Sequence, residues 1–182
     1  CALVGQLARD AEISAVLGRS GACEAAIRAL TTHISEAGAA EHACGCICSL
    51  SSNNADNTTI LARFGACAAV VRALNVHISV GGVAEQACGC IRNLSSDYNI
   101  ENATILHRAG AWKTVVQALG KHISRTGLAY WACNAIRNLA NDSSASRSRT
   151  CTEACEIVVG TLVEHISTSE VVQAACGAIC IL

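Results

Sequence analysis

Four histidines recur in the same local sequence, His-Ile-Ser, at regular intervals along the chain. Histidine often serves as a general base or a metal ligand near neutral pH, so a repeated histidine first suggests a catalytic or metal centre. Such a centre needs side chains that converge, whereas copies in successive units of a repeat lie about one layer apart. We therefore expect these imidazoles to bond free backbone carbonyls at helix ends. The four copies are His33, His77, His122 and His165.

Cysteines are the second candidate for chemistry, and the chain has 13. The pairs Cys44/Cys48 and Cys151/Cys155 are each one helical turn apart, a spacing at which two thiolates could hold a soft metal. Neither pair has further histidine or cysteine partners at zinc-finger spacing, so no metal and no other cofactor is predicted. Two nearby arginines could lower the pKa of the Cys151 thiol, which makes it the candidate for redox sensing.

The number and spacing of the cysteines argue against a disulfide-rich secreted domain. The number is odd, and Cys44, Cys46 and Cys48 alternate within one predicted helix, where such neighbours cannot reach disulfide geometry. Reduced, buried thiols predict a cytoplasmic protein, with the nucleus as the alternative. Glycosylation sequons are the argument for secretion. They begin at Asn57, Asn93, Asn102 and Asn141.

Charge and composition exclude several classes of function. With 13 basic and 14 acidic residues the net charge is −1, and no basic patch of the kind that binds nucleic acid stands out. The longest apolar stretch, Val171 to Leu182, is too short to insert across a membrane. We find no nucleophile elbow, phosphate-binding glycine loop or carboxylate pair, so the chain is predicted not to be an enzyme. Because it contains no methionine, we expect it to be part of a longer protein.

An internal repeat of about 44 residues is the strongest pattern. The segment Gly21-Ala22-Cys23 recurs from residues 65 and 110 and, in degenerate form, from residue 153. A leucine follows each start by nine positions and the His-Ile-Ser segment by twelve. These columns predict a single domain made of a partial unit, 1–20, and four units, 21–64, 65–109, 110–152 and 153–182.

Within each unit the apolar spacing is helical. In the unit that begins at residue 65, one helix is expected over Gly65–Ile78 and a longer one from about Gly82 to Leu94, with Ser79 as its cap. A polar loop and a short helix then lead to the next unit. The segment Ser144–Thr150 is polar and basic where other units have the short helix, so a loop is expected there. The sequence leaves open whether it is phosphorylated.

The units resemble armadillo repeats of the importin-α and β-catenin type. A Gly-Ala opening of the second helix is typical of these repeats. Their third helix carries a sequence of the A-C-x-A-I-R-N-L type, matched here by Ala87–Leu94 and Ala132–Leu139. The resemblance covers the whole chain and implies an all-α fold. That fold is a right-handed α-solenoid of about four units with three helices each, truncated at both ends.

The same resemblance implies that the third helices line a concave groove. On a helical wheel one arc of the 82–94 helix is apolar, and the opposite arc is expected to be open. An asparagine there offers a donor and an acceptor together, so it could hydrogen-bond the main chain of an extended peptide. The predicted partner-binding residues are Glu41, Gly45, Ser49, Glu85, Gly89, Arg92, Asn93, Tyr130, Trp131, Asn134, Arg137 and Asn138.

Two features of these predicted partner-binding residues allow more than one interpretation. Gly45 and Gly89 occupy the same column, which fits either close approach by a ligand backbone or tight packing of adjacent helices. Tyr130 and Trp131 are either anchors for a partner or partly buried between helices. The tryptophan that importin-α places one turn before its asparagine is missing, so a lysine-rich import signal would lose its cation–π contacts.

The predicted function is a protein–protein interaction scaffold that binds an extended peptide or a helix of a partner, and not nucleic acid. The alternatives are a regulatory armadillo segment of a larger enzyme, such as a kinase or ubiquitin ligase, and a structural spacer. Replacing Asn93 and Asn138 by alanine is expected to leave folding intact and to weaken partner binding. A spacer would show no change in binding.

Overall fold

The computed structural model describes residues 3–4, 10–96, 100–140 and 149–182, and this part of the chain is helical with short turns between helices. The short first helices are α2 (Ala11–Arg19), α5 (Ala55–Arg63) and α8 (Ile100–Arg108). The second helices are α3 (Ala22–Thr32), α6 (Ala66–Val76) and α9 (Ala111–Lys121). The third helices are α4 (Ala37–Ser51), α7 (Gly81–Leu94), α10 (Thr126–Ala140) and α12 (Ser169–Ile179). In the last unit α11 (Arg149–Glu164) precedes α12.

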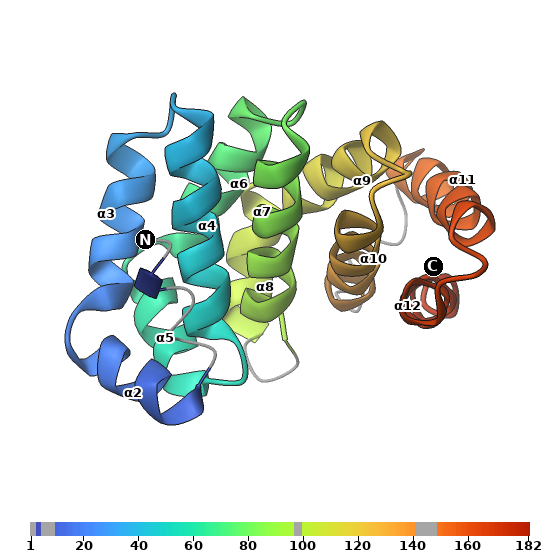
Figure 1. The fold of residues 1–182 in the computed structure, drawn as a ribbon. Helices are drawn as coiled ribbons and strands as arrows, with labels where there is room; N and C mark the ends of the chain where they lie inside the picture. The colour runs from blue at the N-terminus through green and yellow to red at the C-terminus, as the bar shows by residue number, and fades with distance from the viewer. Residues whose placement is uncertain (1–2, 5–9, 97–99, 141–148) are drawn as a thin grey trace.

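The units stack side by side, so the two ends of the chain lie toward opposite ends of the molecule (Figure 1). Helix α4 packs on α7, α7 on α10 and α10 on α12, which makes one continuous layer of third helices. A second layer contains α3, α6, α9 and α11. In Figure 1 the α4 helix is seen from the side and α12 nearly end on, so the helix axes rotate along the stack. The expected all-α solenoid is confirmed.

A glycine in the left-handed conformation precedes each of the helices α3, α6 and α9. The φ angles are +87° at Gly21, +84° at Gly65 and +82° at Gly110. A side chain in this conformation meets the following carbonyl, so residues other than glycine adopt it at a cost of about 1–2 kcal/mol. An added Cβ would meet nothing within 4 Å at any of the three positions. The backbone turn, and not a lack of space, therefore requires glycine there.

The last unit lacks this turn because its start carries Glu153. Glutamate is a good helix former and disfavours the left-handed region, so α11 runs without a break from Arg149 to Glu164. The loop expected over Ser144–Thr150 is wrong for its last two residues, which begin α11. The rest of that segment and the side chain of Cys151, the candidate redox sensor, lie outside the described residues.

The core lies between the two helix layers along the whole stack. The apolar arc of α7 is fully buried, as its spacing predicts; it comprises Ala84, Ala87, Cys88, Cys90, Ile91 and Leu94. The cap expected at Ser79 is wrong: Val80 precedes the first residue of α7 and makes no side-chain capping bond. Small alanine and cysteine side chains allow the helices to approach closely, which suits a thin two-layer stack.

Three of the four glycosylation sequons are inaccessible. Asn57 is 2%, Asn93 4% and Asn102 3% exposed, and all three lie in helices. Asn57 also donates from Nδ2 to the carbonyls of Ser14 and Leu50, each at 3.0 Å. These side chains belong to the packing of the stack. Asn141 lies outside the described residues.

Within the described ranges, no single helix is both long and apolar enough to cross a bilayer. One bent pair, α5 with α6, has the length and composition when both helices are taken together, with a bend of 75° between them.

Candidate functional site

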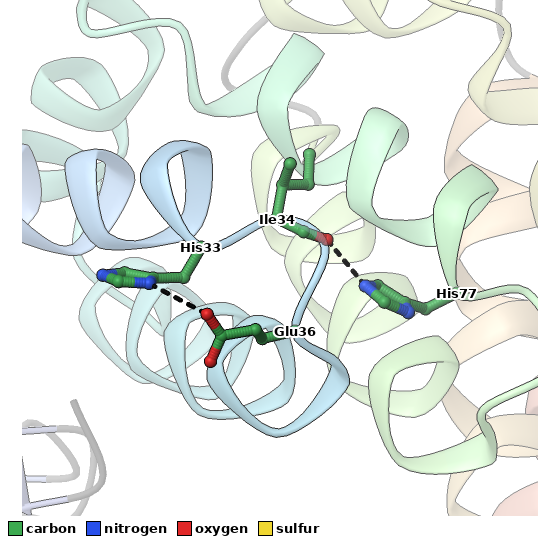
Figure 2. Close-up of polar contacts among 4 residues, drawn as sticks. All are labelled: His33, Ile34, Glu36 and His77. Carbon is green, nitrogen blue, oxygen red and sulfur yellow. Dashed lines mark hydrogen bonds and ion pairs between the residues drawn. The ribbon is translucent and has the colours of Figure 1, made fainter.

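The repeated histidines tie each unit to the one before it. Nε2 of His77 lies 2.7 Å from the carbonyl oxygen of Ile34, as Figure 2 shows. The same contact joins His122 to Ile78 at 2.9 Å and His165 to Ile123 at 2.7 Å. Since the carbonyl accepts, the imidazole N–H donates. Donor and acceptor both belong to His-Ile-Ser segments, so the two middle segments each accept from the next unit and donate to the previous one.

The first copy, His33, makes a different contact. Its Nδ1 lies 3.4 Å from Oε1 of Glu36, and both side chains are more than half exposed (Figure 2). The predicted bond to a carbonyl at a helix end is confirmed for His77, His122 and His165. The carbonyl belongs to the preceding unit. Among the described residues, no three histidine, cysteine, aspartate or glutamate side chains are placed to hold a metal ion.

Asn93 is not open to a ligand. It is 4% exposed, and its Nδ2 donates to the carbonyl of Cys48 (2.9 Å) and to Oγ of Ser51 (3.3 Å), both on α4. Its Oδ1 accepts from Nη1 of Arg92 at 2.9 Å. The expected exposure is wrong because α4 and α7 pack directly on each other, so an amide on that arc reaches the neighbouring helix. Asn93 therefore ties two units together.

The asparagines of α10 differ from each other. Asn134 is 7% exposed and donates from Nδ2 to the carbonyl of Tyr130 within its own helix at 2.9 Å, so its expected exposure is also wrong. Asn138 is half-buried and donates to the carbonyl of Arg92 on α7 at 3.1 Å. Among the described residues its Oδ1 accepts no hydrogen bond, so it is available as an acceptor on this face.

Packing between neighbouring third helices explains why positions 45 and 89 are glycines. Gly89 is buried, which corrects its expected openness, and an added Cβ would lie 2.9 Å from Sγ of Cys48 and 3.5 Å from Cδ2 of Trp131. A Cβ on the half-buried Gly45 would lie 3.3 Å from Oε1 of Gln86. Side chains of neighbouring third helices thus occupy the space that a ligand backbone would need. Of the two interpretations, the structure supports tight packing.

Two glutamates lie over the starts of the following third helices. A Cβ added at Gly82 would collide with the carboxylate of Glu41, and one added at Gly127 with that of Glu85. Oε2 of Glu85 also accepts from Nε of Arg125 at 2.7 Å. A carboxylate at a helix N-terminus interacts favourably with the helix dipole. Both glutamates are half-buried, and both help to join successive units.

Tyr130 and Trp131 are both half-buried, with ring centroids 4.9 Å apart in an edge-to-face arrangement at 71°. Trp131 lies against Gly89 on α7. Tyr130 lines a cavity of about 340 Å³ between α10 and α12. The other residues that line this cavity are Asn134, Arg137, Glu170, Gln173 and Ala174.

A larger cavity of about 420 Å³ lies at the C-terminal ends of α4, α7 and α10. Arg92 and Arg137 line it from successive third helices, and both are half-buried. Its remaining lining residues are Ser51, Asn53, Asn54, Ala55, Thr58, Asn93, Ser96 and Asn138. The sequence analysis missed the contribution of residues 51–58. The one local signal was Asn54, which caps α5 by accepting from the backbone N–H of Asn57.

We call the accessible part of this layer the third-helix face. Four of its side chains, Arg92, Tyr130, Arg137 and Asn138, line the two cavities. The face consists of half-buried side chains and keeps eight of the twelve predicted residues. These are Glu41, Ser49, Glu85, Arg92, Tyr130, Trp131, Arg137 and Asn138.

The cysteines of the stack are free thiols in α3, α4, α6, α7 and α10. Burial raises the pKa of Cys46 and of Cys67 to about 11 and that of Cys133 to about 12. Cys48 differs, because a hydrogen bond with the Cys90 thiol and, less strongly, the charge of Arg92 lower its pKa against the opposing effect of burial. Most of these thiols therefore stay protonated at neutral pH.

Comparison with known proteins identifies the kind of fold. No protein-family model and no curated protein sequence matches the chain. Among solved structures it is similar to a designed armadillo repeat protein in complex with the peptide (KR)4. The match has a TM-score of 0.77 and 25% sequence identity, and it covers 98% of this chain and 72% of that one. The stacked helical units, the glycine turns and this match together identify the fold as an armadillo-like repeat solenoid.

Proposed function

We propose that the chain is a protein-interaction scaffold that holds an extended peptide segment of a partner along the third-helix face. One observation carries the proposal. Third helices of consecutive units form a single layer, and their half-buried side chains line two neighbouring cavities. The similar designed armadillo repeat protein was solved with a bound peptide, which supports the same mode of use here.

The residue types on this face suit binding. Tyrosine, tryptophan and arginine are enriched among the residues that contribute most to protein interfaces, and Tyr130, Trp131, Arg92 and Arg137 supply them. Asn138 offers an amide oxygen to a peptide N–H. Asn93 no longer belongs to the proposed contacts, because its amide is engaged between α4 and α7. Its replacement by alanine would disturb packing and is unsuitable as a binding test.

We favour the scaffold over the regulatory-segment alternative. The described residues supply a face for a peptide, and none of their contacts singles out a kinase or ubiquitin-ligase domain as the ligand. We also propose a reducing compartment, the cytoplasm or the nucleus. The support is that the cysteines in helices α3 to α10 are free and mostly buried, packed as small apolar side chains and not joined in the disulfides typical of oxidising compartments.

The two tryptophans allow a direct test by NMR. Trp131 belongs to the third-helix face, whereas Trp112 lies on α9 and is 8% exposed. A pool of degenerate octapeptides is titrated into labelled protein, and the indole N–H signals are followed. The signal of Trp131 is expected to shift while that of Trp112 stays in place. A shift confined to Trp112, or no shift of either signal at saturating peptide, would contradict the proposed face.

A substitution checks the same proposal by affinity. Tyr130→Ala is expected to weaken binding of the octapeptide pool by about tenfold, the effect of losing a contact worth roughly 1.4 kcal/mol at an interface. Val76→Ala on α6 is the matched control, since Val76 is exposed but lies in the other layer. Fluorescence anisotropy provides the measurement. An equal effect of the two substitutions would argue against the third-helix face.

A further inference from the structure

We propose that the larger cavity binds an anionic side chain of the partner peptide, a carboxylate or a phosphate, between Arg92 and Arg137. This inference rests on the proposed function and specifies the chemistry of the ligand. The cavity spans the C-terminal ends of three successive third helices, so one peptide residue seated there would contact three units.

The two arginines are the charged groups of this cavity among the described residues. The other eight lining residues are serine, threonine, asparagine or alanine, so no carboxylate in that set neutralises the guanidinium groups. No ion pair within the described chain involves either arginine. Burying a charge without a partner is unfavourable, and an anionic ligand would supply the missing partner. Arginine also binds carboxylate and phosphate groups through two parallel hydrogen bonds.

The guanidinium of Arg92 is held in place before any ligand arrives. Its Nη1 donates to Oδ1 of Asn93 at 2.9 Å, and Asn93 is itself fixed by its bond to the carbonyl of Cys48. The remaining N–H groups of Arg92 stay available for a ligand. Arg137 approaches from α10, its Cδ and Nη1 lie beside Gly177 of α12, and it also lines the second cavity, which includes Glu170. A positioned arginine loses less entropy on binding than a mobile one.

The helix ends around the cavity do not cancel this charge. A helix C-terminus carries about half a negative charge, located on its free carbonyls. Here side-chain donors satisfy those carbonyls: Asn93 bonds that of Cys48, and Asn138 bonds that of Arg92. Serine hydroxyls also bond two carbonyls of the last helical turns, from Ser51 to Ile47 (2.8 Å) and from Ser95 to Ile91 (2.6 Å), and the Ile91 carbonyl accepts from the Ser95 backbone N–H as well.

The start of α5 adds a favourable dipole. Its cap, Asn54, and its first residues, Ala55 and Thr58, line the cavity, so the positive end of a nine-residue helix faces it. Asp56 lies in the same first turn but is exposed and does not line the cavity. Two full positive charges and this dipole therefore favour an anion. The peptide of the similar designed protein, (KR)4, would bring like charges to Arg92 and Arg137.

Four pools of degenerate octapeptides test the inference. In each pool one residue type alternates with a mixed position: glutamate, phosphoserine, glutamine or lysine. The full chain is immobilised, and retained peptide is quantified. The glutamate and phosphoserine pools are expected to be retained at least about tenfold more than the other two, the discrimination that one charge-assisted hydrogen bond supplies. Comparing these two pools tells a carboxylate from a phosphate as the preferred anion.

The outcomes separate this inference from the proposed function. Retention of the glutamine or lysine pool as strong as that of the acidic pools would overturn the anion site and leave the scaffold proposal standing. Retention of no pool would overturn both.

Variants then assign the preference to the cavity. Arg92→Gln and Arg137→Gln are each expected to reduce retention of the acidic pools by about tenfold without affecting the glutamine pool. Arg137→Lys keeps the charge and should preserve the preference for acidic over neutral peptides. Arg72→Gln removes the same charge from an exposed position on α6 and should change nothing. Equal losses for Arg72→Gln and Arg137→Gln would show a general charge effect and overturn the site.

Discussion

At the scale of single residues, the histidines show how one side-chain type serves the repeat. The imidazole of His77 reaches the carbonyl of Ile34 in the previous unit, and the same bond recurs at His122 and His165. Each bond satisfies a carbonyl that follows the end of a second helix, where the regular helical partner is missing. A residue that first suggests catalysis therefore contributes to stacking.

His77→Ala is expected to lower the free energy of unfolding by about 1–2 kcal/mol, because the carbonyl of Ile34 loses its donor. His33→Ala is the control: among the described residues the His33 side chain bonds the exposed Glu36, so its loss should change stability by less than about 0.5 kcal/mol. Urea denaturation followed by circular dichroism measures both. Equal effects would mean that the bond between units contributes nothing.

At the scale of helices, the turn before each second helix depends on a left-handed glycine. Gly21, Gly65 and Gly110 have positive φ, and the chain changes direction there. Where Glu153 takes the same place, the two helices of the unit merge into α11. The local backbone preference of a single residue thus decides whether a unit has two helices or one before its third helix.

Gly65→Ala should destabilise the chain by about 1–2 kcal/mol, because alanine must adopt φ of +84°. Gly38→Ala is the matched control: Gly38 is an exposed residue within α4, and an added Cβ meets nothing within 4 Å at either glycine. There alanine should stabilise by about 0.5–1 kcal/mol through its higher helix propensity. Thermal unfolding of the two variants measures the sign of each change in stability. Destabilisation by both substitutions would mean that loss of space, and not φ, governs Gly65.

At the scale of the whole molecule, buried thiols occur in most units of the stack. Burial raises the pKa values of Cys23, Cys46, Cys67 and Cys133 above the ordinary value of 9.0. The folded chain therefore holds these protons to a higher pH than the unfolded chain does. Their contribution to stability is fully present below about pH 9 and is lost as the pH rises toward 11–12.

Stability should therefore fall on alkaline titration above pH 9, by about 1.4 kcal/mol per pH unit for each such thiol. Cys46→Ala removes one titrating group at a column where Ala135 and Ala178 stand in later units, and it should reduce the slope. Cys176→Ala at an exposed position should leave the slope unchanged. Urea midpoints at several pH values test this. Identical slopes for the two variants would exclude Cys46 as a contributor.

Repeated columns in the sequence were enough to determine the helical units, their order and the buried arc of each third helix. Those features follow from local spacing and from the turn preference of glycine, so one unit predicts the next. The charged and aromatic side chains of the third-helix face, including Arg92 and Tyr130, are half-buried, and their role in binding stays a prediction.

Only the tertiary structure decided how far each third helix is covered by its neighbours. A helical wheel treats one helix at a time, so it left Gly89, Asn93 and Asn134 open, whereas α4, α7 and α10 pack directly on one another. The cavity beside Arg92 and Arg137 also needs three units and the start of α5 in register. Contacts between segments more than 40 residues apart set that register, and no local pattern encodes their geometry.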